Sequence, residues 1–182
     1  MKQLLLSKEM KRQAEFGGSL LQGKRKTARP FSKRKPMHIT FKRSNSYWRL
    51  SLVAKQTAIV LLVKALAKKH GVKVYELSVN PDHVHFLLLS PAKKLFQKFL
   101  RECSAKIVGL MTGTKKGQRL VARFWQSRPW SRLIEWGRAF TAVRDYILRN
   151  RLETAGVVPY DRKVSTKTIL TGWGNSSPLS KA

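Results

Sequence analysis

The chain is poor in cysteine, in acidic residues and in long apolar runs. Its single cysteine, Cys103, has no partner for a disulfide within the chain and excludes a zinc site made of several thiolates. We expect this thiol to be buried, reduced and inert. No apolar run approaches the roughly 20 residues that cross a bilayer, and the N-terminal residues lack the apolar core of a signal peptide. A cytoplasmic protein without membrane contact is therefore expected.

The shortage of acidic residues argues against one common kind of nuclease site. Only nine residues are Asp or Glu, against 38 Lys or Arg, and the formal net charge is +29. Nucleases that use two metal ions gather several carboxylates around them, and the sequence shows no such cluster. A strongly basic protein binds polyanions by releasing their counterions, largely regardless of sequence. Nucleic acid is therefore the expected partner.

The length of 182 residues fits one domain with flanking segments. Residues 1–36 combine Gly, Pro and clustered Lys and Arg without an apolar period, which indicates a basic, flexible arm. Residues 37–156 alternate strand and helix patterns and form the expected folded domain. Residues 157–182 have the composition of a loop and indicate a C-terminal tail.

Strand and helix patterns alternate in the order β-α-β-β-α-β-α. Asn80-Pro81-Asp82 is strong turn chemistry, so the strands on either side of it should pair as an antiparallel hairpin. The first six elements predict an α+β fold, the ferredoxin-like split β-α-β sandwich, with helices on one face of an antiparallel sheet and the other face free. The strands are expected at 37–43, 72–79, 83–90 and 124–134, and the helices at 54–71, 91–111 and 137–156. The apolar stripe of the first helix is expected at Ala58, Leu61, Leu62, Ala65 and Leu66.

Two histidines stand one residue apart in the strand "HVHFLLLS". Side chains at i and i+2 of a strand point to the same side, so His83 and His85 face together, away from the helices. The chain has four histidines in all, and this pair favours two corners of a metal site over two structural polar residues. His38, on the first strand, is expected to be structural.

The last helix carries a candidate nucleophile. Tyr146 and Asn150 are spaced i, i+4 and stand close together around the helix. A tyrosine hydroxyl can attack phosphorus and form a covalent intermediate, although a tyrosine on an amphipathic helix more often serves packing. The Asn150 amide oxygen could complete a ligand set with His83 and His85.

The two motifs together resemble a known family. "NPDHVHFLL", followed further along the chain by "YILRN", resembles the single-tyrosine HUH transposases, specifically the REP-associated tyrosine transposases. The phrases "PMHITFKR", "RFWQSRPWSRLI" and "YILRNRLETAGVVPY" also look like that family, and the resemblance covers about residues 35–160.

The resemblance implies a catalytic domain that cleaves and rejoins single-stranded DNA through a 5′-phosphotyrosine. His83 and His85 match the ligands of a divalent ion, Mg²⁺ or Mn²⁺, and Tyr146 matches the nucleophile. Asn150 stands where many members carry Gln as the third ligand. The implied substrates are palindromic single-stranded DNA hairpins. Relatives include monomers and homodimers in which the tyrosine is supplied in trans.

Clustered basic residues are expected to contact DNA phosphates, with a solvated surface as the alternative. These are Lys24, Arg25, Lys26, Arg29, Lys33, Arg34, Lys35, Lys115, Lys116, Arg119, Arg123 and Arg128. Aromatic side chains can stack on unpaired bases. Of Trp125, Trp130 and Trp136, two are expected in the core.

Two other functions remain open from the sequence. A non-catalytic basic domain could hold structured DNA or RNA, but such a domain needs none of His83, His85, Tyr146 or Asn150. A phosphodiesterase could use the metal and water, with Tyr146 structural.

Overall fold

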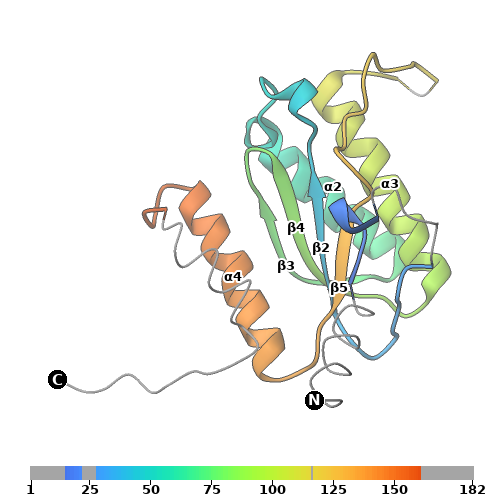
Figure 1. The fold of residues 1–182 in the computed structure, drawn as a ribbon, viewed down its shortest axis with the longest axis vertical. Coiled ribbons are helices and arrows are strands. Elements are labelled where there is room, and N and C mark those ends of the chain that lie inside the picture. The colour runs from blue at the N-terminus through green and yellow to red at the C-terminus, as the bar shows by residue number, and fades with distance from the viewer. Residues whose placement is uncertain (1–14, 22–27, 116, 161–182) are drawn as a thin grey trace.

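The computed structural model describes residues 15–21, 28–115 and 117–160, which form a mixed helix and strand fold around one sheet (Figure 1). Five strands lie in the order β1-β5-β2-β4-β3, and each neighbouring pair is antiparallel. The strands are β1 (Glu15–Phe16), β2 (Met37–Lys42), β3 (Lys73–Val79), β4 (His83–Leu89) and β5 (Trp130–Leu133). The order β5-β2-β4-β3 is that of the ferredoxin-like sandwich, so the predicted fold class and the β3–β4 hairpin are confirmed.

Helices α2 (Gln56–His70) and α3 (Lys93–Thr112) pack on one face of the sheet. Alternate residues of β2 and β4, such as Ile39 and Phe86, are fully buried against them. Burial of this apolar layer is the main source of stability of the fold. Helix α2 ends as predicted, because Gly71 adopts the left-handed conformation with φ of 62°.

The predicted apolar stripe of α2 was correct at Leu66 and partly at Leu62, which packs against the core, but the stripe as a whole is displaced around the helix. The residues that face the core are Ile59, Val63, Leu66 and Ala67, and Leu61 is 61% exposed. The physical reason is the sequence "AIVLLVKALA", which is apolar nearly all the way round, so that several helical faces look equally suited to burial.

Helix α4 (Arg138–Thr154) lies on the opposite face of the sheet, over β3 and β4 (Figure 1). Its Ile147 packs with Leu87 of β4 and with Ile134, all three fully buried. The expectation that this second face is free therefore needs correction, because α4 covers the part that carries His85 and Leu87. The sheet alternation explains this: Val84, Phe86 and Leu88 point to α2 and α3, and the residues between them point to α4.

Part of the segment predicted as an arm belongs to the sheet. Glu15 and Phe16 pair with Arg132 and Ser131 of β5, and Phe16 is buried. Gly17 follows with φ of 86°, and a Cβ at this position would lie 2.2 Å from the carbonyl oxygen of Pro129. Only glycine fits this turn onto β5.

Three short 3-10 helices complete the described structure: η1 (Gly18–Leu21), η2 (Asn45–Tyr47) and η3 (Leu52–Lys55). Within the described ranges, no helix is both long and apolar enough to cross a membrane. Lys24, Arg25, Lys26 and Lys116, and the tail from residue 161, lie outside the described residues.

Candidate active site

His83 and His85 lie side by side on β4, on the face that α4 covers. Their ring centroids are 4.6 Å apart and the rings are nearly perpendicular. The two differ in exposure, since the His83 side chain is 26% exposed and His85 is 5% exposed as a residue. His83 therefore stands at the mouth of the site and His85 at its floor.

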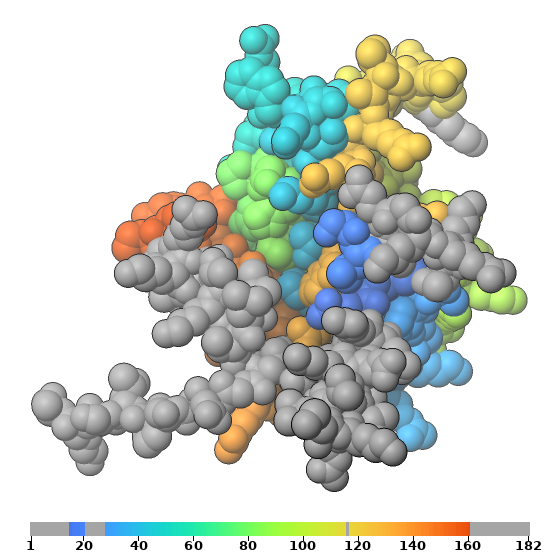
Figure 2. Space-filling view, viewed as in Figure 1, coloured from blue at the N-terminus to red at the C-terminus, as the bar shows by residue number. Residues whose placement is uncertain are grey.

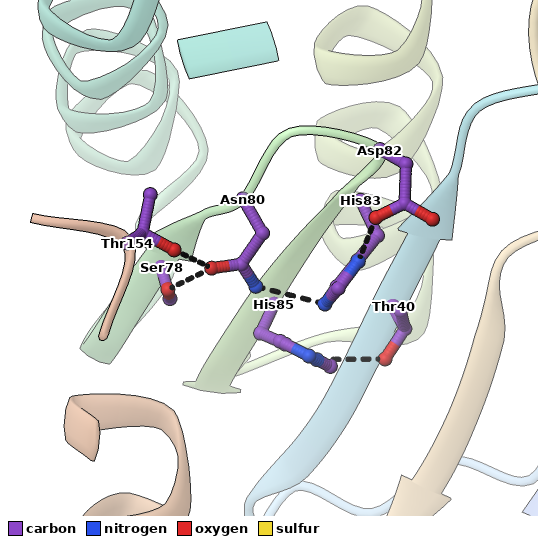
Figure 3. A network of polar contacts seen from close by, with 7 residues as sticks. All are labelled: Thr40, Ser78, Asn80, Asp82, His83, His85 and Thr154. Atoms are coloured by element: carbon purple, nitrogen blue, oxygen red, sulfur yellow. Dashed lines mark hydrogen bonds and ion pairs between the residues drawn. The ribbon is translucent and has the colours of Figure 1, made fainter. Parts of the chain in front are cut away.

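The tautomer of His83 is set by two neighbours from the β3–β4 turn (Figure 3). Its Nδ1 lies 2.6 Å from Asp82 Oδ1, and the amide Nδ2 of Asn80 lies 2.8 Å from its Nε2. An amide nitrogen can only donate, so Nε2 accepts and Nδ1–H donates to the carboxylate. The hydrogen bond from His83 lowers the pKa of Asp82, which keeps this carboxylate ionised.

The Asn80 amide is itself held by two hydroxyl groups. Ser78 Oγ donates to its Oδ1 at 3.1 Å, and Thr154 Oγ1 donates to the same atom at 2.7 Å. Asn80 is 3% exposed, so these bonds are shielded from water. Because Thr154 is the last residue of α4, the network joins the end of this helix to the histidine strand (Figure 3).

Residues of β2 contact one ring nitrogen of His85, and the other ring nitrogen has no such contact. Its Nδ1 lies 3.0 Å from Thr40 Oγ1 and 3.1 Å from Nε2 of His38. Its Nε2 is buried and has no hydrogen-bond partner among the described residues. Burial lowers the pKa of His85 well below its usual value, helped by His38 and His83. Burial, with the charge of Arg132 and with His83, lowers the pKa of His38 to about 3. Both rings are therefore neutral at neutral pH.

Tyr146 faces the same histidines from α4. Its ring centroid lies 5.4 Å from that of His85 and 6.2 Å from that of His38, at steep interplanar angles. The ring packs beside the small cluster of Leu87, Ile134 and Ile147. The tyrosine comes from a different element than the histidines, and the sandwich brings the three rings together.

Asn150 bonds within its own helix. Its Nδ2 donates to the backbone oxygen of Tyr146 at 2.8 Å, which turns the side chain back along α4. The bond uses the amide nitrogen and leaves Oδ1, the atom that a hard cation prefers. The structure thus places Asn150 next to Tyr146.

The residues present suit a bound cation. A metal ligand must be a neutral imidazole with an available lone pair. The lone pair on Nε2 of His83 accepts from Asn80, so a cation would have to displace this amide. If the proton of His85 is on Nδ1, from which it can be donated to Thr40 Oγ1, the lone pair on the buried Nε2 of His85 is available to a cation. Across the described ranges, no three His, Cys, Asp or Glu side chains gather closely enough to hold a metal.

The basic residues expected to contact DNA fall into separate regions. Lys115, Arg119 and Arg123 are exposed in the segment after α3, which projects at one end of the molecule beside η2 (Figure 2). Lys33 and Arg34 are exposed before β2, and Arg128 is exposed before β5. Lys35 pairs with Glu135. Arg29 is half-buried, and its predicted contact with a phosphate stays a prediction.

The three tryptophans differ in environment. Trp125 packs against the main core and donates from Nε1 to the Ser104 carbonyl at 3.3 Å. Trp130 lies edge-on to His38, with centroids 5.2 Å apart. Trp136 is 49% exposed, so it is the one best placed to stack on a base.

The residues that support the site were not predicted from the sequence. Asn80 and Asp82 were interpreted only as turn residues, and Thr40, Ser78 and Thr154 were not singled out. Asp82 could have been found, because a carboxylate beside a metal-binding histidine commonly orients its ring. The Asn80–Thr154 contact had no signal in the sequence.

Comparison with known proteins decides the family. The family model described as "Transposase IS200 like" matches residues 33–150, which include His83, His85, Tyr146 and Asn150. The chain belongs to the IS200-like transposase family. It is therefore a transposase by family, a DNA-processing enzyme.

A solved structure agrees on the fold of this transposase. A REP-associated tyrosine transposase bound to a REP hairpin is 18% identical, with a TM-score of 0.56 over 87% of this chain and 94% of that chain. A Deinococcus radiodurans protein, assigned as a transposase, is 15% identical over 70% of this chain and 98% of that one; its TM-score of 0.41 carries no weight. No curated protein sequence matches the chain.

Proposed function

We propose that this transposase cleaves and rejoins single-stranded DNA at hairpins, with Tyr146 as the nucleophile. The observation that carries the proposal is the approach of the Tyr146 ring to His85, 5.4 Å between centroids, beside a buried imidazole nitrogen to which the described residues offer no hydrogen-bond partner. A purely structural cluster has no use for an orphaned lone pair, because a buried unsatisfied polar atom is costly. The REP hairpin bound by the structural neighbour favours a hairpin substrate.

The reaction is a transesterification. Tyr146 Oη forms a bond to the scissile phosphorus while the bond to the 3′-oxygen breaks, the phenol loses its proton and the 3′-oxygen gains one. The product is a 5′-phosphotyrosine and a free 3′-hydroxyl. A second 3′-hydroxyl reverses the step, restores a phosphodiester and releases the tyrosine, so no external energy source is needed.

His83, His85 and Asn150 are the proposed ligands of a divalent cation, Mg²⁺ or Mn²⁺. A bound cation would polarise the scissile phosphate and stabilise charge on the leaving oxygen. Asp82 holds His83 in the ligating tautomer, and Thr40 and His38 hold the His85 ring in place. The cover of α4 over the histidine face excludes water from the side of His85.

The test is a covalent adduct. Labelled single-stranded DNA carrying hairpins from the genomic flank of the gene is mixed with the protein and Mn²⁺, and run on a denaturing gel. We expect a protein–DNA band that chelator removes and that Tyr146→Phe lacks, whereas Tyr75→Phe, on the same face, retains it. Free cleaved DNA that survives Tyr146→Phe would indicate hydrolysis by water instead. Binding without any cut product would indicate a non-catalytic domain.

A further inference from the structure

A cavity of about 250 Å³ lies on the other side of the sheet from Tyr146, between α3 and the segment that leads into β2. Its apolar wall includes Phe31 and Phe96, whose ring centroids are 5.7 Å apart. Its charged residues are Arg29, Lys93 and Arg101, and no carboxylate is found among the described residues that line it. This volume is smaller than that of typical drug-sized ligand sites and suits a compact group.

Arg29 is a half-buried cation, and the groups that hold it among the described residues are neutral. Its guanidinium donates to the hydroxyl of Ser131 and, at 2.7 Å, to the carbonyl oxygen of Pro129. It stacks on the Phe16 ring with 4.5 Å between Cζ and the centroid. Burial, together with the charge of Arg128, lowers its pKa to about 10, so it remains charged at neutral pH. A partly buried charge is costly unless it is paired, and no carboxylate among the described residues pairs with Arg29, so a bound anion would offset part of this cost.

The rim of the cavity adds two exposed cations to Arg29. Lys93 and Arg101 are exposed on α3, one near its start and the other two turns along the same side. Gln97 lies between them and is also exposed, with an amide that can donate and accept. A cationic rim over an aromatic wall is the arrangement that binds single-stranded nucleic acid, phosphate to the cations and base to the ring.

We propose that this cavity is a second DNA-contact site that holds one unpaired nucleotide, its phosphate near Arg29 and Arg101 and its base against Phe31. The proposal goes beyond the cleavage site and rests on single-stranded DNA being the substrate. Because α3 and α4 lie on opposite faces of the sheet, the cavity cannot act on the scissile phosphate. It adds affinity and fixes where the strand lies.

The experiment measures binding without cleavage, in the full chain with Tyr146→Phe. Fluorescein-labelled heptathymidylate is titrated at several NaCl concentrations and followed by anisotropy. Lys93→Gln combined with Arg101→Gln is compared with Lys64→Gln combined with Lys68→Gln, an equally exposed pair on α2. We expect the cavity pair to lower the slope of log affinity against log salt by about 1 more than the control pair does. Equal slopes and affinities for the two pairs would overturn the proposal.

Two further arms separate a nucleotide from a simple anion. Phe31→Leu should weaken binding by at least about 5-fold, with the salt slope unchanged, since stacking does not release counterions. Thymidine monophosphate should displace the labelled strand at concentrations where inorganic phosphate does not. Equal competition by phosphate, with Phe31→Leu unaffected, would mean an anion site only and would overturn the assignment to a nucleotide. A protein that binds here but never forms an adduct would count against the proposed function and not against this site.

Discussion

The side-chain nitrogen of Asn80 lies 2.8 Å from Nε2 of His83, so the amide occupies the lone pair with which this histidine would bind a cation. Two hydroxyl groups hold the amide in that orientation, one from β3 and one from the end of α4. A cation bound as proposed would therefore compete with the amide for this atom.

Binding of a cation should release Asn80 from His83. In a ¹H–¹⁵N spectrum, we expect Mg²⁺ to shift the side-chain amide signals of Asn80, assigned by their loss in Asn80→Ser. The side-chain amide signals of Gln126, an exposed residue in the segment before β5, serve as the control. If calorimetry shows Mg²⁺ binding while the Asn80 signals stay in place, His83 Nε2 is not the ligand atom.

Asp82→Asn should weaken the proposed metal site. The carboxylate accepts from His83 Nδ1 at 2.6 Å and fixes the tautomer, and a neutral amide would do this less well. Loss of such a supporting group commonly lowers metal affinity by about 10- to 100-fold. Calorimetry with Mn²⁺ measures the change, with Asp145→Asn as the matched control because Asp145 is an exposed carboxylate on α4. Unchanged affinity in Asp82→Asn would contradict this role.

Thr154→Val should loosen the attachment of α4 to the β3–β4 turn. The substitution keeps the side-chain shape and removes the hydroxyl that donates to Asn80 at 2.7 Å. We expect the free energy of unfolding to fall by about 1 kcal/mol, measured by urea denaturation. Thr141→Val, at an exposed position of the same helix, should change it little. Equal effects of the two substitutions would show that the contact adds nothing.

Gly17→Ala should detach β1 from the sheet edge. A methyl group here meets the Pro129 carbonyl oxygen at 2.2 Å, and the backbone φ is 86°. The comparison is Gly113→Ala, where φ is 70° but no atom lies within 4 Å, so only conformational strain is added. We expect the free energy of unfolding to fall by about 1 kcal/mol in Gly113→Ala and by distinctly more in Gly17→Ala. The melting temperatures of the two variants measure this difference. Similar melting temperatures would mean that the clash is relieved.

Cys103 should be unreactive in the native protein. The thiol is buried, and burial together with the nearby Glu102 raises its pKa to about 12. At pH 8 only about one thiol in ten thousand would be ionised, and the thiolate is the reactive form. Iodoacetamide should therefore modify the denatured chain and leave the folded chain unmodified by mass spectrometry. Rapid alkylation of the folded chain would show that the site opens.

The sequence predicted those parts of the molecule that depend on local patterns. The facing pair His83 and His85 follows from the two-residue period of a strand, and the closeness of Tyr146 and Asn150 follows from the i, i+4 spacing of a helix. The turn at residues 80–82 follows from the turn chemistry of its own residues. The hairpin and the end of α2 at Gly71 belong to the same class, because turn and cap chemistry is written in a few neighbouring residues.

What could not be predicted depends on where distant segments meet. The face of α2 was ambiguous because its sequence is apolar all round. The position of α4 over the histidines, and hence the Asn80–Thr154 bond, depends on how the β5–α4 connection folds back. The pairing of Glu15 and Phe16 with β5 joins residues that lack any strand-length pattern, since two residues show no period.

The short strand β1 also has a consequence for how molecules of this protein meet one another. Without it, β5 would present a row of unpaired backbone groups, a template on which another chain could add a strand. The pairing of Glu15 and Phe16 with Arg132 and Ser131 caps β5 at these positions. A shortened chain that began at Met37 would lose this cap, and its concentrated solutions would be the first place for edge-to-edge association to show.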